Sequence, residues 1–310
     1  MLLKWFISNG SIKDDALSGV TVALALVPEA VAFAFIADIP PVIGLYGAFM
    51  MGLITAVFGG RPGMISGATG ALAVVMFDFL PIAKEMGPDG LENPHLHYLF
   101  LILITMGLMQ ILFGALKLGK LVRLIPHPVM IGFVNGLAIV ICTAQFTMFK
   151  NPDDSWFEGQ KMMTMLGLVA LTMIIMWGLP KLTKKIPAGL VAIATVTALV
   201  YFGGIETDNV LSFLQSKGDD KATMAANLPV FEIPFYGYFN HIMNPESIFF
   251  ILKWATILAA IGLIESLMTL QLVDEITETK GSGNKESFGQ GLANIINGFF
   301  GGMGGCAMIG

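Results

Sequence analysis

The sequence predicts an all-α polytopic membrane protein from its composition, the length of its apolar runs and the lack of a strand pattern. Of its 310 residues, 55% are hydrophobic and 13% are charged, whereas a soluble domain carries about 25% charged residues. Its mean hydropathy is +0.77. Apolar runs of about 20 residues, the length at which a helix crosses the hydrocarbon core of a bilayer, recur along the chain. No alternating polar and apolar pattern indicates a transmembrane barrel.

The apolar runs predict nine complete membrane-spanning segments and the beginning of a tenth. Residues 1–17 precede the first span and suit a cytoplasmic or interfacial segment, because Lys4, Trp5 and Phe6 favour a short helix at the membrane surface. Residues 205–246 are polar and are expected to form a loop outside the membrane. The predicted spans are residues 18–37, 41–58, 64–81, 97–116, 128–149, 162–180, 187–204, 247–272 and 287–302, with the tenth entered near Met303.

The basic residues predict the orientation of these spans. With the N-terminus in the cytoplasm, eleven of the seventeen Lys and Arg residues fall in cytoplasmic segments and five in outer ones. Cytoplasmic loops carry such an excess of positive residues. The orientation places residues 205–246 on the extracytoplasmic side, and it requires residues 64–81 to cross the membrane once.

The third predicted span begins with an unusual stretch, FGGRPGMISGATG, from Phe58 to Gly70. Irregular backbone at membrane depth must be buried in protein or line a cavity, because lipid cannot satisfy its amides. In transporters, a half-length helix that begins near the midplane points free N–H groups at an anionic substrate. The stretch therefore predicts an extended entry followed by a ligand-facing helix, with Ser66 and Thr69 as capping or ligand-contacting hydroxyls. A re-entrant turn or a packing face of small residues remains the alternative.

A similar stretch, FGGMGGCAMIG, runs from Phe300 to Gly310. It begins with the same three residues as the first stretch and is equally rich in glycine. Transporters built from inverted repeats place paired helix interruptions at matching points of their two halves, with the binding site between them. The two similar stretches therefore favour a ligand-binding site over a packing face of small residues.

Three parts of the sequence resemble the sulfate permease (SulP) family of anion transporters. LSGVTVALALVPEAVAFAFIADIPPVIGLYGAF is similar to the family's first two spans and FGGRPGMISGATGALAVV to its third. IGLIESLMTLQLVDEITETKGSGNKESFGQGLANIINGFFGGMGGCAMIG is similar to the eighth and ninth spans and the entry to the tenth. The resemblance implies two inverted repeats of seven spans. Residues 18–204 then form the first repeat (spans 1–7), and residues 247–310 begin the second (spans 8, 9 and the entry to 10).

The resemblance also implies where an anion binds, between half-helices of spans three and ten. Many relatives have proline at the position of Ala71, and the 310 residues stop before most of the tenth span and before the STAS domain that is common in the family. A complete core and gate of the family type therefore needs further spans. The expected binding residues are Phe33 of the first span, Thr69, Gly70, Ala71 and Leu72 of the third, and Ala307, Met308 and Ile309 of the tenth.

Ionisable residues inside spans are candidate functional groups. Glu265 and Thr269 lie four residues apart in the eighth span, on one helix face. In sodium-coupled relatives, a carboxylate and a hydroxyl at these positions help to hold the cation, while a buried Glu also suits a proton. A purely structural, protonated Glu265 is the alternative. Glu29 follows Pro28 in the first span and either satisfies backbone donors or takes part in proton movement. Asp78 is expected to face water.

The sequence predicts a secondary active transporter of small inorganic anions, of the sulfate or bicarbonate class, coupled to H⁺ or Na⁺ through alternating access. A dicarboxylate or nucleobase carrier of the same fold and an anion channel remain alternatives. No catalytic motif indicates an enzyme. No cofactor, nucleic acid or metal is expected, apart from Na⁺ at Glu265 and Thr269. Cys142 and Cys306 are interpreted as small core residues. The expected location is the bacterial inner membrane, with a homodimer left open.

Overall fold

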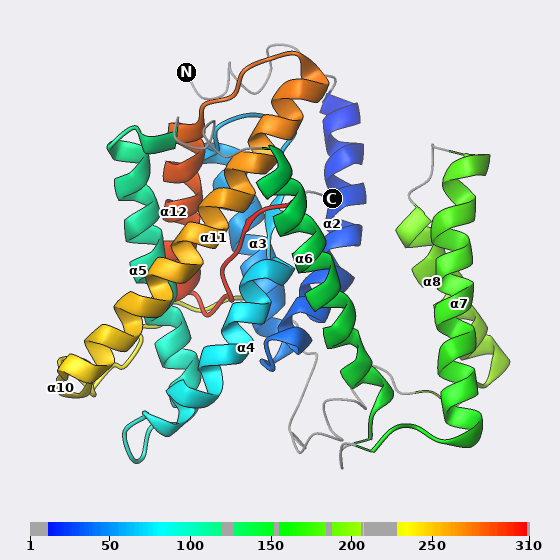
Figure 1. Cartoon of the computed structure of the whole chain (residues 1–310), viewed down its shortest axis with the longest axis horizontal. Coiled ribbons are helices and arrows are strands. Elements are labelled where there is room, and N and C mark those ends of the chain that lie inside the picture. The colour runs from blue at the N-terminus through cyan, green and yellow to red at the C-terminus, as the bar shows by residue number, and fades with distance from the viewer. Residues whose placement is uncertain are drawn as a thin grey trace. The chain divides into compact units, whose positions relative to one another are not determined.

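The computed structural model describes residues 12–119, 127–151, 155–183, 188–205, 207 and 228–308, and helices make up most of them (Figure 1). The elements lie close to the predicted spans. The helices are α2 (Ile12–Ile36), α3 (Pro41–Phe58), α4 (Gly70–Glu85), α5 (Pro94–Ala115), α6 (His127–Gln145), α7 (Gly159–Leu182), α8 (Ala188–Gly203), α10 (Phe239–Ile242), α11 (Pro245–Thr277) and α12 (Gly283–Phe299), with a 3-10 turn at Phe146–Phe149 and two short strands, β1 (Ser66–Gly67) and β2 (Cys306–Ala307).

Several helices begin where the sequence carries a start signal. Pro41, Pro94 and Pro245 each occupy the first turn of their helix, where the missing N–H costs nothing. Asn244 caps α11 by accepting a hydrogen bond from the backbone of Glu246 (3.3 Å). These residues fix the helix starts locally, before any tertiary packing.

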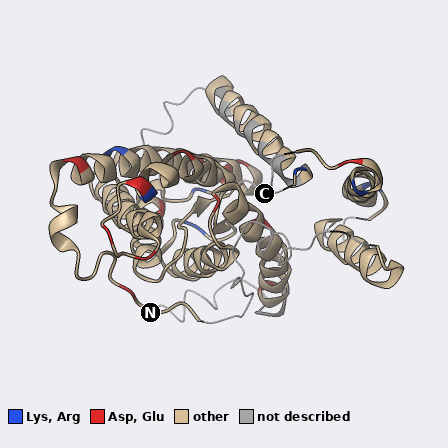
Figure 2. Ribbon diagram, turned by 90° about the horizontal axis from the view of Figure 1, so that it is seen from below, with Lys and Arg blue, Asp and Glu red and all other residues tan. Residues whose placement is uncertain are grey.

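Only some of the described helices are long and apolar enough to cross a membrane. Five of them are long and apolar enough to cross a membrane, namely α2 from Asp15 onward, α3, α5, α7 and α11. Figure 2 shows that most of the described ribbon carries neither acidic nor basic residues. Helix α2 already begins at Ile12, before the predicted span start at Ser18, and α11 is longer than the predicted eighth span at 33 residues.

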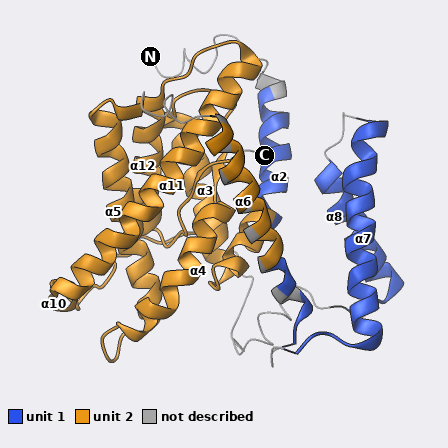
Figure 3. Ribbon diagram, in the orientation of Figure 1, with its two compact units in different colours: residues 1–28, 145–224 blue, residues 29–144, 225–310 orange. Residues whose placement is uncertain are grey.

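The chain divides into two compact units (Figure 3). One unit comprises residues 1–28 and 145–224, and within it α7 has no buried residue. The other comprises residues 29–144 and 225–310 and holds a continuous apolar core, which includes Met76, Phe79, Tyr98 and Leu103. All the residues expected to bind an anion or a coupling ion belong to this second unit.

Glycines bring α5 and α12 into close contact in the second unit. A Cβ atom on Gly107 would lie 2.4 Å from the carbonyl oxygen of Gly291, and one on Gly291 would lie 2.5 Å from that of Gly107. Gly114 and Gly298 meet the backbone of the opposite helix at similar distances. Helices in membranes associate through such small residues because no water drives apolar side chains together. Helix α5 of this crossing also packs against α4.

Candidate functional site

The two glycine-rich stretches meet as an antiparallel strand pair. Ser66 is paired with Ala307 and Gly67 with Cys306, and the N–H of Met308 donates to the carbonyl of Ile65 (2.9 Å). All four paired residues are buried. The structure therefore brings together two segments that are far apart in the sequence. A Cβ atom on Gly305 would lie 1.8 Å from the carbonyl oxygen of Gly67, so glycine is required for this approach.

Helix α4 begins directly after β1, at Gly70, with an extended residue, Thr69, as its N-cap. Residues 64–69, which the predicted span included, are therefore not helical. The first backbone hydrogen bond of the helix runs from the N–H of Ala73 to the carbonyl of Thr69 (3.0 Å). The N–H groups of residues 70–72 find no acceptor among the described residues, and all three residues are buried. The free amides carry the positive end of the helix dipole.

Two apolar side chains stand in front of this helix start. A Cβ atom on Gly70 would lie 2.9 Å from Cε1 of Phe33 and 2.5 Å from Cδ1 of Ile141. The structure thus places the predicted wall residue Phe33 against the predicted half-helix. Ile141, on α6, was not identified in the sequence, and nothing distinguishes it from the other apolar residues of that helix.

The predicted coupling residues lie on α11, beside β2. Glu265 is 8% exposed and Thr269 is 3% exposed. The carboxylate of Glu265 accepts a hydrogen bond from the thiol of Cys306 (2.9 Å). The hydroxyl of Thr269 lies 2.9 Å from the carbonyl oxygen of Glu265 and 3.3 Å from that of Ala307. Ser266 accepts from the N–H of Ala307 (3.0 Å), so α11 holds β2 at two adjacent residues.

The remaining predicted residues differ in how far they are buried. Glu29 is half-buried on α2 and interacts with Glu265 as a like charge. Met308 is half-buried at the end of β2, and Ile309 lies outside the described residues. Asp78 is exposed on α4, and that it faces water stays a prediction. Cys142 is also exposed, so its interpretation as a core residue is wrong, whereas Cys306 is buried.

A row of buried polar side chains on α12 was missed by the sequence analysis. Gln290 donates to Ser66 (2.8 Å) and to Glu286 (2.7 Å), and Asn294 donates to the carbonyl of Gly305 and accepts from its N–H (both 3.0 Å). Glu286, Gln290 and Asn294 follow at intervals of four residues, which places them on one helix face. That spacing is visible in KESFGQGLANIINGF and was the available signal. The row holds both glycine-rich stretches in place.

Glu286 also fixes the entry to the first stretch, since its carboxylate accepts from the N–H of Gly60 (2.6 Å). Nearby, Arg61 forms an ion pair with Asp274 of α11. The carboxylate of Asp274 in turn accepts from the N–H of Gly281 (2.8 Å). The loop after α3 is therefore attached to both α11 and α12.

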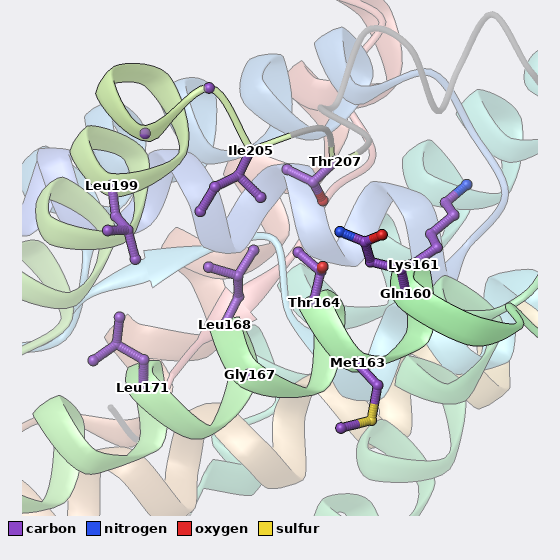
Figure 4. A pocket seen from close by; sticks show the side chains of 12 residues that line it. Gln160, Lys161, Met163, Thr164, Gly167, Leu168, Leu171, Leu199, Ile205 and Thr207 are labelled. Atoms are coloured by element: carbon purple, nitrogen blue, oxygen red, sulfur yellow. The ribbon is translucent and has the colours of Figure 1, made fainter.

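The other unit contains an open hollow of about 1080 Å³ next to α7 and α8 (Figure 4). Its wall combines apolar residues with the polar side chains of Gln160, Lys161, Thr164 and Thr207, and none of the sequence-predicted site residues lines it. The candidate site is therefore the junction of β1, β2, α4 and α11 in the second unit.

Comparisons with known proteins agree with this fold. The chain is 41% identical over 307 residues to YbaR of Bacillus subtilis (strain 168), a candidate sulfate transporter, with 99% of this chain and 57% of the relative covered. It is 32% identical to the bicarbonate transporter BicA of Picosynechococcus sp., covering 95% of this chain and 52% of the relative. The chain thus spans about half the length of these curated relatives.

Comparison with solved structures also supports this fold. The transmembrane domain of a cyanobacterial bicarbonate transporter BicA matches with a TM-score of 0.76 and 29% identity, over 94% of this chain and 73% of that one. The murine Solute Carrier 26 family member A9 anion transporter, in its inward-facing state, matches with a TM-score of 0.70 at 15% identity, over 99% and 54% of the two chains. The fold is thus the inverted-repeat transporter fold, with the first repeat and the start of the second present. The profile of the sulfate permease family matches residues 12–309, and the chain belongs to that family.

Proposed function

We propose that these residues form part of a secondary active transporter of small inorganic anions, of the sulfate or bicarbonate class. The observation that carries the proposal is the uncapped start of α4, where the buried N–H groups of residues 70–72 have no acceptor among the described residues. Such amides bind anions without a fixed positive side chain. Phe33 and Gly70 form one side of the site, and Ala307, Met308 and Ile309 approach it from the second repeat.

The coupling ion is assigned to the neighbouring carboxylate. Glu265 is buried on α11 and is connected through Cys306 to Thr69, the residue that precedes the free amides. A cation or proton at Glu265 therefore lies two hydrogen bonds from the proposed anion site. Thr269 and Glu29 are its proposed partners. Since Thr269 can bind Na⁺ through its oxygen, both H⁺ and Na⁺ remain candidates.

The proposed organisation follows the sequence prediction. Residues 1–17 lie in the cytoplasm or at the interface, residues 18–204 form the first repeat, and residues 205–246 form an extracytoplasmic loop. Residues 247–310 begin the second repeat. The protein is proposed to lie in the bacterial inner membrane with its N-terminus in the cytoplasm and to act without enzymatic chemistry. Alternating access then exposes the junction of α4 and β2 to one side at a time.

The test is uptake of radiolabelled sulfate and bicarbonate by proteoliposomes that contain the complete polypeptide carrying these residues. We expect one of the two anions to accumulate above equilibrium when an inward H⁺ or Na⁺ gradient is imposed, and not without a gradient. Uptake of a radiolabelled dicarboxylate, or of uracil or xanthine, without uptake of either inorganic anion would contradict the substrate class. Anion currents without accumulation would indicate a channel instead.

A further inference from the structure

Thr69 occupies the N-cap position of α4, but its side chain does not cap the helix. Its backbone is extended (φ −128°, ψ 148°), the usual N-cap conformation, and its side chain makes no capping hydrogen bond. In that position a threonine hydroxyl normally accepts from the N–H of the second or third helical residue. Here those residues are Ala71 and Leu72. A capping residue therefore precedes α4, but its side chain does not form the capping hydrogen bond.

The hydroxyl is directed to Cys306 instead. Oγ1 of Thr69 lies 3.3 Å from Sγ of Cys306, and that sulfur lies 2.9 Å from Oε2 of Glu265. A thiol has one proton, and the thiol of Cys306 donates it to the carboxylate. When Glu265 is ionised, the sulfur is therefore the acceptor for the hydroxyl of Thr69. The two hydrogen bonds form a directed chain from Thr69 through Cys306 to Glu265.

The surroundings hold this chain in one arrangement. Thr69 is 2% exposed and Cys306 is fully buried, so water does not compete for either group. Cys306 is fixed by its pairing with Gly67 in the strand pair, and its neighbour Ala307 is held by Ser266. Besides Cys306 itself, the charged or titratable groups that act electrostatically on this cluster are Glu29 on α2 and Glu286 on α12.

We propose that Cys306 is a positioning residue that keeps the start of α4 open to the anion by holding the hydroxyl of Thr69 away from it. This inference rests on the proposed function. Without the sulfur, the hydroxyl is able to rotate and accept from an α4 amide, and that amide is then lost to the anion. Self-capping by threonine competes with anion binding.

The test measures the KM and kcat of radiolabelled sulfate or bicarbonate uptake, whichever the wild type accumulates, in the complete polypeptide. Cys306→Ala should raise KM about five-fold, which corresponds to the stabilisation of about 1 kcal/mol that a capping hydroxyl gives, with a smaller change in kcat. Cys306→Ser should restore KM, because a serine hydroxyl donates to Glu265 and accepts from Thr69. In a Thr69→Val background, Cys306→Ala should change KM little, since no hydroxyl remains to cap the helix.

Three results separate the inference from the proposed function. Unchanged KM in Cys306→Ala, or an equal rise in the Thr69→Val background, would overturn the role of Cys306 while leaving anion transport intact. Absence of sulfate and bicarbonate uptake by the wild type would overturn both. Cys142→Ala, which removes an exposed thiol, is the matched control and should leave KM unchanged.

If Cys306→Ala does not fold, a spectroscopic measurement tests the same hydrogen bonds. With Cys306 as the sole cysteine of the polypeptide, its S–H stretching band in the infrared should lie at the lowered frequency of a hydrogen-bonded thiol. The band should shift in Thr69→Val, because the sulfur loses its donor. A band at the frequency of a free thiol, unaffected by Thr69→Val, would overturn the proposal.

Discussion

At the scale of single residues, the partner of each buried polar group decides what the site is able to bind. Thr69 precedes α4, Cys306 lies in β2 and Glu265 lies on α11, and two hydrogen bonds join them. Buried polar groups of this kind are costly unless paired. Here the pairing uses the side chains and leaves the amides of α4 without acceptors among the described residues. The N–H groups left free at the start of α4 are donors, which suits an anion.

The first prediction concerns Glu265. Glu265→Gln should reduce gradient-driven accumulation to the equilibrium level and leave anion affinity close to that of the wild type. The amide keeps an oxygen that accepts from Cys306, but it neither carries a negative charge nor exchanges a proton. Accumulation in proteoliposomes and anion binding in detergent are measured on the same preparation. Asp78→Asn is the control, since that acid is exposed on α4, and undiminished accumulation in Glu265→Gln would refute the coupling role.

The second prediction concerns Gly70. Gly70→Leu should weaken anion affinity on the order of tenfold or more, which corresponds to at least about 1.4 kcal/mol, because its Cβ atom would already lie 2.5 Å from Ile141 and 2.9 Å from Phe33. The added side chain fills the space in front of the free amides. Equilibrium binding of sulfate or bicarbonate provides the measurement. Gly132→Leu, on α6, serves as the control because a Cβ atom there meets nothing within 4 Å; wild-type affinity in Gly70→Leu would exclude binding at this helix start.

At the scale of elements, α12 has two faces that contact different parts of the second unit. One face carries the polar row of Glu286, Gln290 and Asn294, which holds the two glycine-rich stretches. The other carries Gly291 and Gly298, which pack against the backbone of α5. The helix therefore connects its close crossing with α5 to the two glycine-rich stretches. Damage to that crossing should reach the site through α12.

The third prediction tests this crossing. Gly291→Val should destabilise the protein by about 1–3 kcal/mol, as overpacking of a filled interior does, because its side chain would begin 2.5 Å from the carbonyl oxygen of Gly107. Thermal unfolding in detergent, followed by tryptophan fluorescence, should show a melting temperature lowered by several degrees. Gly136→Val, in open surroundings on α6, is the matched control. Equal melting temperatures for the two variants would show that the crossing is not tightly packed.

The elements also show what the sequence was able to predict. Helices α3, α5 and α11 begin at prolines and run through long apolar stretches, so local signals specify them. The extended entry before α4 followed from its glycines. The contact of Ile141 with Gly70 was not predictable, because one apolar residue among many carries no positional signal. The donor role of Cys306 was missed for a related reason, since a buried cysteine is usually a small apolar residue.

At the scale of the whole molecule, the proposed site uses two segments far apart in the sequence, which the strand pair of β1 and β2 joins. In the proposed organisation, β1 and α4 belong to the first repeat, while α11 and β2 belong to the second. The chain spans about half the length of its curated relatives. The central claim is therefore that an anion binds at the start of α4, within the complete polypeptide.

The most direct measurement is protection of a thiol introduced at that point. Ala71→Cys, in a background with the other cysteines replaced, is treated with an anionic methanethiosulfonate reagent with and without saturating sulfate or bicarbonate. The account predicts that the transported anion slows modification, because reagent and substrate compete for the same amides. The same substitution at Asp78, exposed farther along α4, should react at an unchanged rate. A thiol at position 71 that reacts equally fast with and without either anion, or does not react at all, would contradict the proposed site.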